Sequence, residues 1–149
     1  MKFFKSFLLI LILLSSCTFE ENVKFEQIKY VKLAGVKDGM VNLTAEANFF
    51  NPNDISGKLK SIDLEVLLKD KSLARIMQTN HFKIDKNANF SIPINVSFAM
   101  ADLQENFLDN LLAIVSGNKL TLHFKGEIKV STWGFTQTVP VSYYEEVRL

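Results

Sequence analysis

The chain has 149 residues, and 48% of them are hydrophobic, which suits one domain with a single core. Its 17 Lys and Arg against 16 Asp and Glu leave a near-neutral balance, which gives no reason to expect a nucleic acid partner, because such proteins usually carry a basic face that neutralises phosphates. Its single cysteine excludes a disulfide framework within the chain.

The chain begins with the pattern of a targeting segment. Lys2 and Lys5 flank the start of an apolar run over residues 7–14, which is too short to cross about 30 Å of hydrocarbon as a helix. Residues 14–17, Leu-Ser-Ser-Cys, resemble the lipobox of bacterial lipoproteins, in which the cysteine receives a diacylglyceryl group and becomes the new amino terminus. We therefore expect a signal peptide over residues 1–16, cleavage between Ser16 and Cys17, and acylation of Cys17 with chains such as palmitate. The alternative is an ordinary signal peptide with an incidental cysteine.

Residues 17–22 follow as the lipidated cysteine and a short polar tether. Position 18 is threonine, whereas the best-known sorting rule retains lipoproteins at the inner membrane by an aspartate there, so the outer membrane is favoured. The acidic pair Glu20 and Glu21 resembles a surface-export signal, which leaves both the periplasmic and the surface face open. The expected partner is the membrane, because two or more acyl chains give a stable anchor.

From residue 23 onward, apolar and polar side chains alternate, as in half-buried strands. Reversals at Asp38-Gly39 and Trp133-Gly134 separate alternating runs. The connections are mostly too short for crossover helices, so the pattern predicts two packed antiparallel sheets. About seven strands are expected, at 23–34, 41–49, 62–68, 72–78, 90–98, 120–130 and 135–143. In the last strand the inward-facing residues should be Phe135, Val139, Val141 and Tyr143.

One segment departs from this alternation. Between Asp102 and Ser116 the apolar residues recur at helical spacing, which predicts one amphipathic helix. Asp102 is a suitable N-cap, and Gly117 stands where a helix C-terminus favours glycine. The apolar stripe should pack over an open end or edge of the sandwich; a lipid surface or a partner protein is the alternative. The stripe consists of Leu103, Phe107, Leu108, Leu111, Leu112 and Val115.

The series of residues 41–50 followed by Asn51, Pro52 and Asn53 resembles the late embryogenesis abundant (LEA) type 2 family, whose module is also called the WHy domain. The resemblance covers nearly all of residues 23–149. It implies an all-β fold, a seven-stranded antiparallel β-sandwich of the immunoglobulin/fibronectin III-like kind, with one helix before the last two strands.

Three prolines mark expected features of the sheets. Pro52 has no N–H and a fixed φ, so it should end its strand, while the side chains of Asn51 and Asn53 should bond to nearby backbone. The alternative is that the two amides bind a ligand. Pro93 and Pro140 lie within strand patterns, which predicts sheet edges or bulges there.

No catalytic, cofactor-binding or metal site is predicted. His81 and His123 have no cysteine or second histidine at ligand spacing, and His123 lies on the polar face of its strand. No serine stands in a Gly-x-Ser-x-Gly elbow. The adjacent glutamates 20 and 21, like 145 and 146, would point to opposite faces of an extended chain. We therefore expect a protein without enzymatic activity, metal or cofactor.

Together these features predict a lipid-anchored, non-enzymatic β-sandwich of the cell envelope. The family resemblance implies stress protection or envelope maintenance, in which the sandwich shields membrane or other macromolecules. Two alternatives stay open. The protein could be an adaptor or subunit that docks on another envelope protein, or a carrier that holds an acyl chain between the sheets, under the 102–116 helix.

Overall fold

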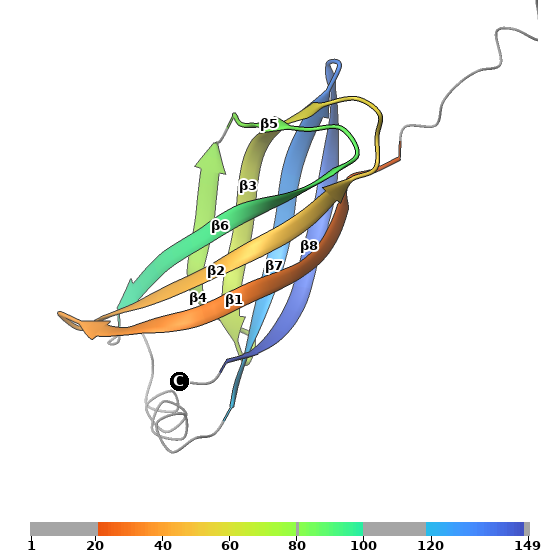
Figure 1. Ribbon diagram of the computed structural model, residues 1–149. Coiled ribbons are helices and arrows are strands. Elements are labelled where there is room, and N and C mark those ends of the chain that lie inside the picture. Colours follow the sequence, from red (N-terminus) through yellow and green to blue (C-terminus); the bar gives the residue numbers. More distant parts are fainter. Residues whose placement is uncertain (1–20, 80, 100–118, 148–149) are drawn as a thin grey trace, which may run out of the picture.

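The computed structural model describes residues 21–79, 81–99 and 119–147, which form eight strands in two antiparallel sheets packed as a β-sandwich (Figure 1). The smaller sheet has three strands, and the larger sheet has five. The order in the smaller sheet is β1 (Lys24–Lys37), β2 (Met40–Asn51) and β6 (Ala88–Ala99). The order in the larger sheet is β4 (Lys71–Thr79), β3 (Gly57–Leu68), β7 (Leu120–Thr132) and β8 (Phe135–Val147), and β5 (Lys83–Ile84) pairs with the start of β3.

This architecture confirms the all-β fold and the two antiparallel sheets. The predicted count of seven strands is wrong, because β5 adds an eighth: its two residues pair with Gly57 and Lys58, and a segment that short carries no alternating pattern. The helix predicted over 102–116 lies outside the described residues, as do Cys17 and the signal peptide. In the described ranges, no helix is long and apolar enough to cross a bilayer.

The core lies between the two sheets and is built from the inward-facing rows of the strands. In β2 the burial alternates from residue to residue, and the predicted row from Val41 to Phe49 is buried throughout. Phe49 from the smaller sheet and Phe124 from the larger sheet are among the largest fully buried side chains. The interdigitation of two such rows is the usual core of a sandwich.

The prediction for β8 is partly wrong. Val139 and Val141 are buried, and Tyr143 is partly buried against the core, as expected. Phe135, however, is 73% exposed. It belongs to the same row as the two valines, but the β7–β8 hairpin runs on past the end of the core, so the facing sheet does not cover it (Figure 1).

A glycine in the middle of β7 allows two strands to approach closely. Gly126 pairs with Leu64 of β3 and with Val141 of β8, and its φ is 155°. A Cβ atom at this position would lie 2.1 Å from the backbone oxygen of Asp63. Glycine inside a strand often marks such a close approach of a neighbouring backbone.

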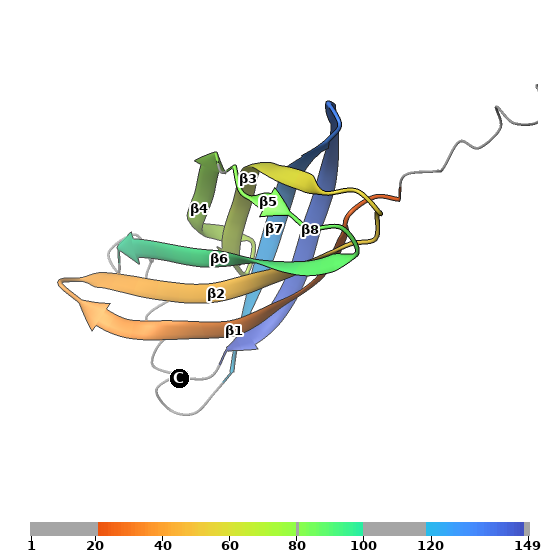
Figure 2. The same ribbon diagram turned by 45° about the horizontal axis from the view of Figure 1, so that its top comes forward.

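The four outer strands meet in pairs at the sides of the sandwich, where β1 contacts β8 and β4 contacts β6 (Figure 2). Pro93 lies in β6 and Pro140 in β8, which are outer strands of their sheets, and this confirms the prediction of edges. The pairing of β1 with β2 has three irregularities, and Tyr30 in β1 has a φ of 54°. Each of these features interrupts a regular edge.

Candidate functional site

The Asn51-Pro52-Asn53 motif lies at the end of the sandwich where β1 begins. The ladder of β2 ends at Asn51, directly before Pro52, as the missing N–H of proline predicts. Both asparagines are buried, since Asn51 is 2% exposed and Asn53 7%. Buried amides need hydrogen-bond partners, and these partners define what the motif does.

The side chain of Asn51 joins two loops. Its Oδ1 accepts hydrogen bonds from the backbone N of Asn53 at 3.2 Å and from Asn53 Nδ2 at 3.0 Å. Its Nδ2 donates to the backbone oxygen of Ile55 at 3.1 Å and to that of Asp85 at 2.9 Å. The bond from the backbone N–H of Asn53 to Asn51 Oδ1 is the local Asx bond expected from the motif. The bond to Asp85 ties the β2–β3 loop to the segment after β5.

Asn53 extends this hydrogen-bond network to Glu21, shortly before β1. Its Nδ2 donates to the backbone oxygen of Glu21 at 2.7 Å, and its own backbone oxygen accepts from the N–H of Asn87 at 3.0 Å. The side chain of Asn87 donates to Asp54 at 2.6 Å, so the loops before β3 and before β6 are joined twice.

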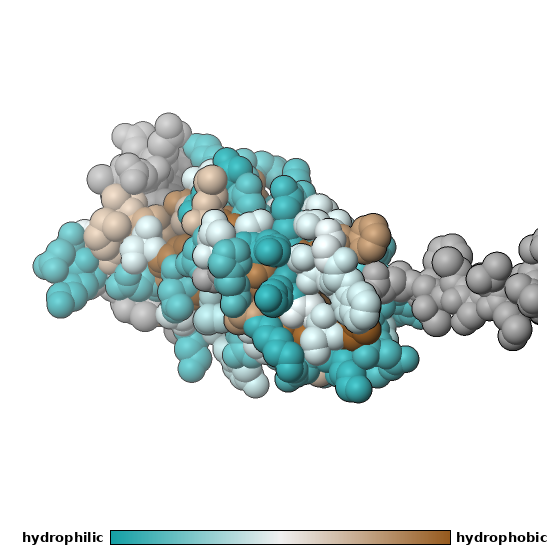
Figure 3. Space-filling view, turned by 90° about the horizontal axis from the view of Figure 1, so that it is seen from above, coloured by the Kyte–Doolittle hydropathy of each residue, from teal (hydrophilic) through white to brown (hydrophobic). Residues whose placement is uncertain are grey.

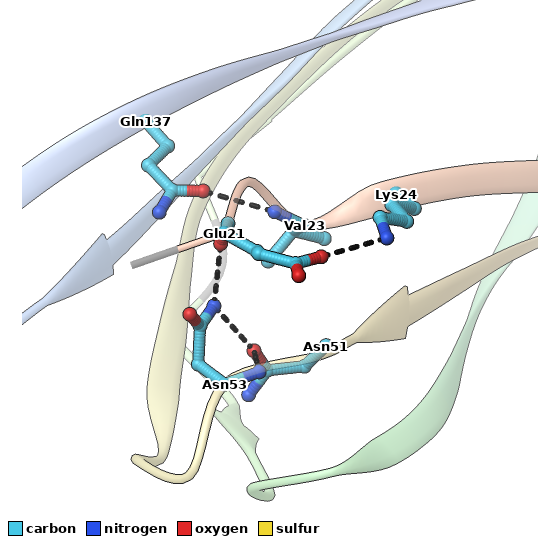
Figure 4. A network of polar contacts seen from close by, with 6 residues as sticks. All are labelled: Glu21, Val23, Lys24, Asn51, Asn53 and Gln137. Atoms are coloured by element: carbon cyan, nitrogen blue, oxygen red, sulfur yellow. Dashed lines mark hydrogen bonds and ion pairs between the residues drawn. The ribbon is translucent and has the colours of Figure 1, made fainter. Parts of the chain in front are cut away.

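The larger sheet holds the same region from the other side (Figure 4). The backbone N–H of Val23 donates to Oε1 of Gln137 in β8 at 3.0 Å, and Lys24 and Glu21 form an ion pair of 2.8 Å on the surface. We call Glu21, Val23, Asn51, Asn53 and Gln137 the N-terminal junction. It fastens the chain, just before β1, to both sheets.

The buried side-chain amides of Asn51 and Asn53 form their hydrogen bonds within the protein. Within the described ranges, no buried side-chain nitrogen or oxygen lacks a hydrogen-bond partner. The bonds of Asn51 and Asn53 therefore favour the structural interpretation of the motif over ligand binding. The motif itself was visible in the sequence, whereas Gln137 was not singled out, although a polar residue in the inward row between Phe135 and Val139 was a signal for it.

The histidines lie apart from the junction. His81 is exposed in the segment before β5, and His123 lies on the outer face of β7, as predicted. The His123 ring stacks on Tyr144 with centroids 4.0 Å apart, and its Nε2 lies 3.0 Å from Ser142 Oγ. Across the part of the chain that is described, no three His, Cys, Asp or Glu residues are grouped so as to hold a metal ion.

Charges on the outer face of the larger sheet are paired across strands. Arg75 of β4 donates two hydrogen bonds to the carboxylate of Asp63 in β3, from Nε at 2.9 Å and from Nη2 at 2.8 Å. These hydrogen bonds, helped by the positive charges of Arg75 and Lys129, hold the pKa of Asp63 below its ordinary value, against desolvation, which raises the pKa and is second in size only to the hydrogen bonds. Asp63 also lines a surface depression of about 300 Å³, together with residues that include Ser61, Met77, Thr79 and Glu127.

The family model described as late embryogenesis abundant protein, LEA_2, matches residues 47–143. The chain belongs to the LEA_2 family. The match includes Asn51, Asn53 and Gln137 of the junction, while Glu21 and Val23 precede it. A comparison with curated proteins finds no match.

Three solved structures resemble the LEA_2 fold of this chain. A protein from Archaeoglobus fulgidus is 10% identical, with a TM-score of 0.59, and 85% of this chain aligns with 98% of that one. A candidate LEA protein is 14% identical, with a TM-score of 0.63 and coverage of 97% and 78%. A protein from Arabidopsis thaliana is 12% identical, with a TM-score of 0.63 and coverage of 91% and 87%. At these identities the likeness is one of fold.

Proposed function

We propose that this LEA_2 protein is a lipid-anchored, non-enzymatic protein of the cell envelope, held at the outer membrane through Cys17, where its sandwich protects or maintains the envelope under stress. The observation that carries the proposal is the short distance in sequence between the lipobox-like residues 14–17 and the fold. Glu21 already accepts a hydrogen bond from Asn53, and Val23 is buried. An extended chain advances at most about 3.5 Å per residue, so Cys17 would lie within roughly 14 Å of Glu21.

The use of the polar groups supports a role without catalysis. The buried amides of Asn51 and Asn53 bond to backbone, and the exposed carboxylate of Asp63 is occupied by Arg75. A rigid sandwich whose polar groups are paired in this way acts through its surface, by contact with membrane or with other macromolecules. Ion pairs with a purely structural role also shift the pKa values of their members, so the lowered pKa of Asp63 is consistent with a structural role.

The adaptor alternative is favoured by one observation, the exposure of large apolar side chains such as Met77, Trp133 and Phe135. Exposed apolar side chains that lie close together often mark interaction sites. The carrier alternative would place its ligand under residues 102–116, which lie outside the described ranges. Between the described strands, large side chains such as Phe49 and Phe124 occupy the core.

The anchor is tested by metabolic labelling with an alkyne analogue of palmitate in a Gram-negative host that produces the full chain. Wild-type protein should carry the label and fractionate with the outer membrane, and the Cys17→Ser variant should lose both properties. Ser16→Ala is the matched control, because it keeps a small residue before the cysteine and should retain the label. An unlabelled wild-type protein would refute the anchor.

The protective role is tested in the same cells. We expect cells with the wild-type protein to retain envelope integrity after drying or osmotic shock, measured by exclusion of an impermeant dye. Cells with the Cys17→Ser variant should leak as much as cells without the protein. Equal dye entry in all three strains would contradict a role in envelope protection.

A further inference from the structure

The tip of the β7–β8 hairpin carries two exposed aromatic side chains. Thr132 pairs with Phe135, so Trp133 and Gly134 form a two-residue turn. Trp133 is 82% exposed and Phe135 73%, the first and second highest values among the exposed large hydrophobic side chains of the described residues. Such a pair on one protruding turn is a candidate contact surface.

The backbone at this turn is costly for a tryptophan. Trp133 has a φ of 48° and Gly134 a φ of 86°, the positive values that a type I′ turn requires. The β1–β2 turn adopts similar values, 53° and 75°, with Asp38 and Gly39, which tolerate them. A bulky residue at positive φ is unusual, and the exposed Trp133 gains no burial within the fold that would offset the strain. Lys69 adopts the same φ of 48° in the β3–β4 turn, so this conformation belongs to the two-residue turn, and it is the exposed aromatic ring at the tip that points to a contact surface.

The tip lies at the same end of the sandwich as the start of β1 (Figures 1 and 2). Figures 1 and 2 both place the β7–β8 turn and the start of β1 at the same end, and Figure 3, seen from above, shows hydrophobic colour beside the start of the described chain. The hydrogen bond from Val23 to Gln137 fixes this relation. Trp133 is four residues from Gln137 along the hairpin, which is about 13 Å in a strand.

The length of the tether fits this arrangement. Cys17 precedes Val23 by six residues, which reach at most roughly 20 Å. A lipid on Cys17 would therefore hold the sandwich near the bilayer surface, with enough slack for the hairpin tip to touch it. Once the lipid is inserted, the second contact is intramolecular, so a weak contact of two aromatic side chains becomes effective.

We propose that Trp133 and Phe135 insert into the headgroup region of the bilayer that holds Cys17, and this rests on the lipid anchor proposed above. Tryptophan favours the membrane–water boundary because its ring is apolar and its N–H can remain bonded to water or headgroups, and phenylalanine buries its ring among the upper acyl carbons. The two contacts orient the sandwich, with the Asp38-Gly39 turn at the opposite end pointing away from the membrane.

The experiment uses Trp133 as its own probe, because it is the single tryptophan of the chain. Full-length protein purified from membranes is reconstituted into vesicles of phosphatidylethanolamine and phosphatidylglycerol. We expect blue-shifted emission and quenching by lipids brominated on the upper acyl carbons. Water-like emission that is quenched by iodide would overturn the insertion. Emission already blue-shifted in the full-length Cys17→Ser protein without vesicles would also overturn it, because protein rather than lipid would then cover Trp133.

A control moves the probe to the other end of the sandwich. The double variant Trp133→Phe and Met40→Trp places the single tryptophan beside the Asp38-Gly39 turn and keeps an aromatic ring at the hairpin tip. This probe should be quenched by iodide and not by brominated lipid; equal lipid quenching at both positions would overturn the proposed orientation. The acyl content of Cys17 is measured by mass spectrometry on the same samples. Acylated protein with a water-exposed Trp133 refutes the insertion alone, whereas absence of acylation refutes the anchor and the insertion that depends on it.

Discussion

The side-chain amide of Asn53 donates a hydrogen bond of 2.7 Å to the backbone carbonyl of Glu21, 32 residues earlier in the chain. This bond joins the first described residue to the β2–β3 loop. Gln137 holds Val23 from the opposite sheet, so the segment that enters the fold is attached on both sides before β1 starts. The motif in which Asn53 lies thus acts at the point where the proposed tether meets the body.

We predict that Asn51→Ala destabilises the fold by about 2–4 kcal/mol. The substitution removes four hydrogen bonds and takes the acceptor Oδ1 away from the buried backbone N–H of Asn53, and an unsatisfied buried polar group costs about 1–3 kcal/mol. Urea denaturation measures the effect. Asn89→Ala is the control, because Asn89 is exposed on β6, and it should change stability by less than about 0.5 kcal/mol. Similar losses for the two variants would contradict the role of Asn51.

Gly126→Ala should be severely destabilising, by at least about 3 kcal/mol, because the added Cβ would meet the backbone of Asp63 at 2.1 Å and a backbone cannot move aside like a flexible side chain. The same substitution at Gly39 provides a comparison. Gly39 has a φ of 75° and no atom within 4 Å of an added Cβ, so Gly39→Ala should cost about 1 kcal/mol from backbone strain alone. Thermal unfolding of both variants distinguishes steric clash from strain, and equal shifts would refute the close approach of β3 and β7.

The strands could be predicted from the sequence because one face of each strand is buried. The inward row from Val41 to Phe49 can be recognised from its period of two alone, and the packing of the folded protein follows that period. The prediction that Phe135 is buried in β8 was wrong, because the alternation of the strand continues beyond the end of the facing sheet. Alternation identifies a face, whereas the extent of the opposite layer decides burial.

The junction was predictable only in its local part. The sequence indicated that Asn51 and Asn53 bond to nearby backbone, and the bond from the Asn53 N–H to Asn51 is of that kind. The partners Asp85 and Glu21 are 34 and 32 residues away, and only the packing of three loops brings them together. β5 escaped prediction for a similar reason, because its two residues are defined by pairing with Gly57 and Lys58 and not by a pattern of their own.

The pKa of Asp63 gives a prediction for pH dependence. Hydrogen bonds and positive charge from Arg75 lower this pKa in the folded state, so the pair stabilises the fold above the ordinary aspartate pKa, and this contribution is lost as the pH falls through the lowered value. Titration of the Asp63 carboxyl carbon by NMR should show a lower midpoint in the wild type than in Arg75→Gln. Lys129→Gln should raise the midpoint less, since Lys129 contributes a smaller effect. An unchanged midpoint in Arg75→Gln would contradict the pairing.

Trp133→Asn should stabilise the isolated protein by about 1 kcal/mol, because asparagine tolerates the positive φ that tryptophan adopts there only with strain. Chemical denaturation in the absence of lipid measures the change. Trp133→Ala is the control: it removes the ring but keeps a residue that disfavours this φ, so it should gain less. A loss of stability in Trp133→Asn would show that the ring supports the fold, and would weaken the case for a role at the membrane.

Pro93 and Pro140 bear on how copies of the protein would pack if many of them were held side by side on one membrane surface. Molecules confined to two dimensions meet side by side far more often than molecules in free solution, and an open strand would invite one copy to continue the sheet of the next. A missing N–H in the middle of β6 and of β8 interrupts such a shared ladder at its centre. Dense coverage of a surface is therefore compatible with each copy remaining a separate body.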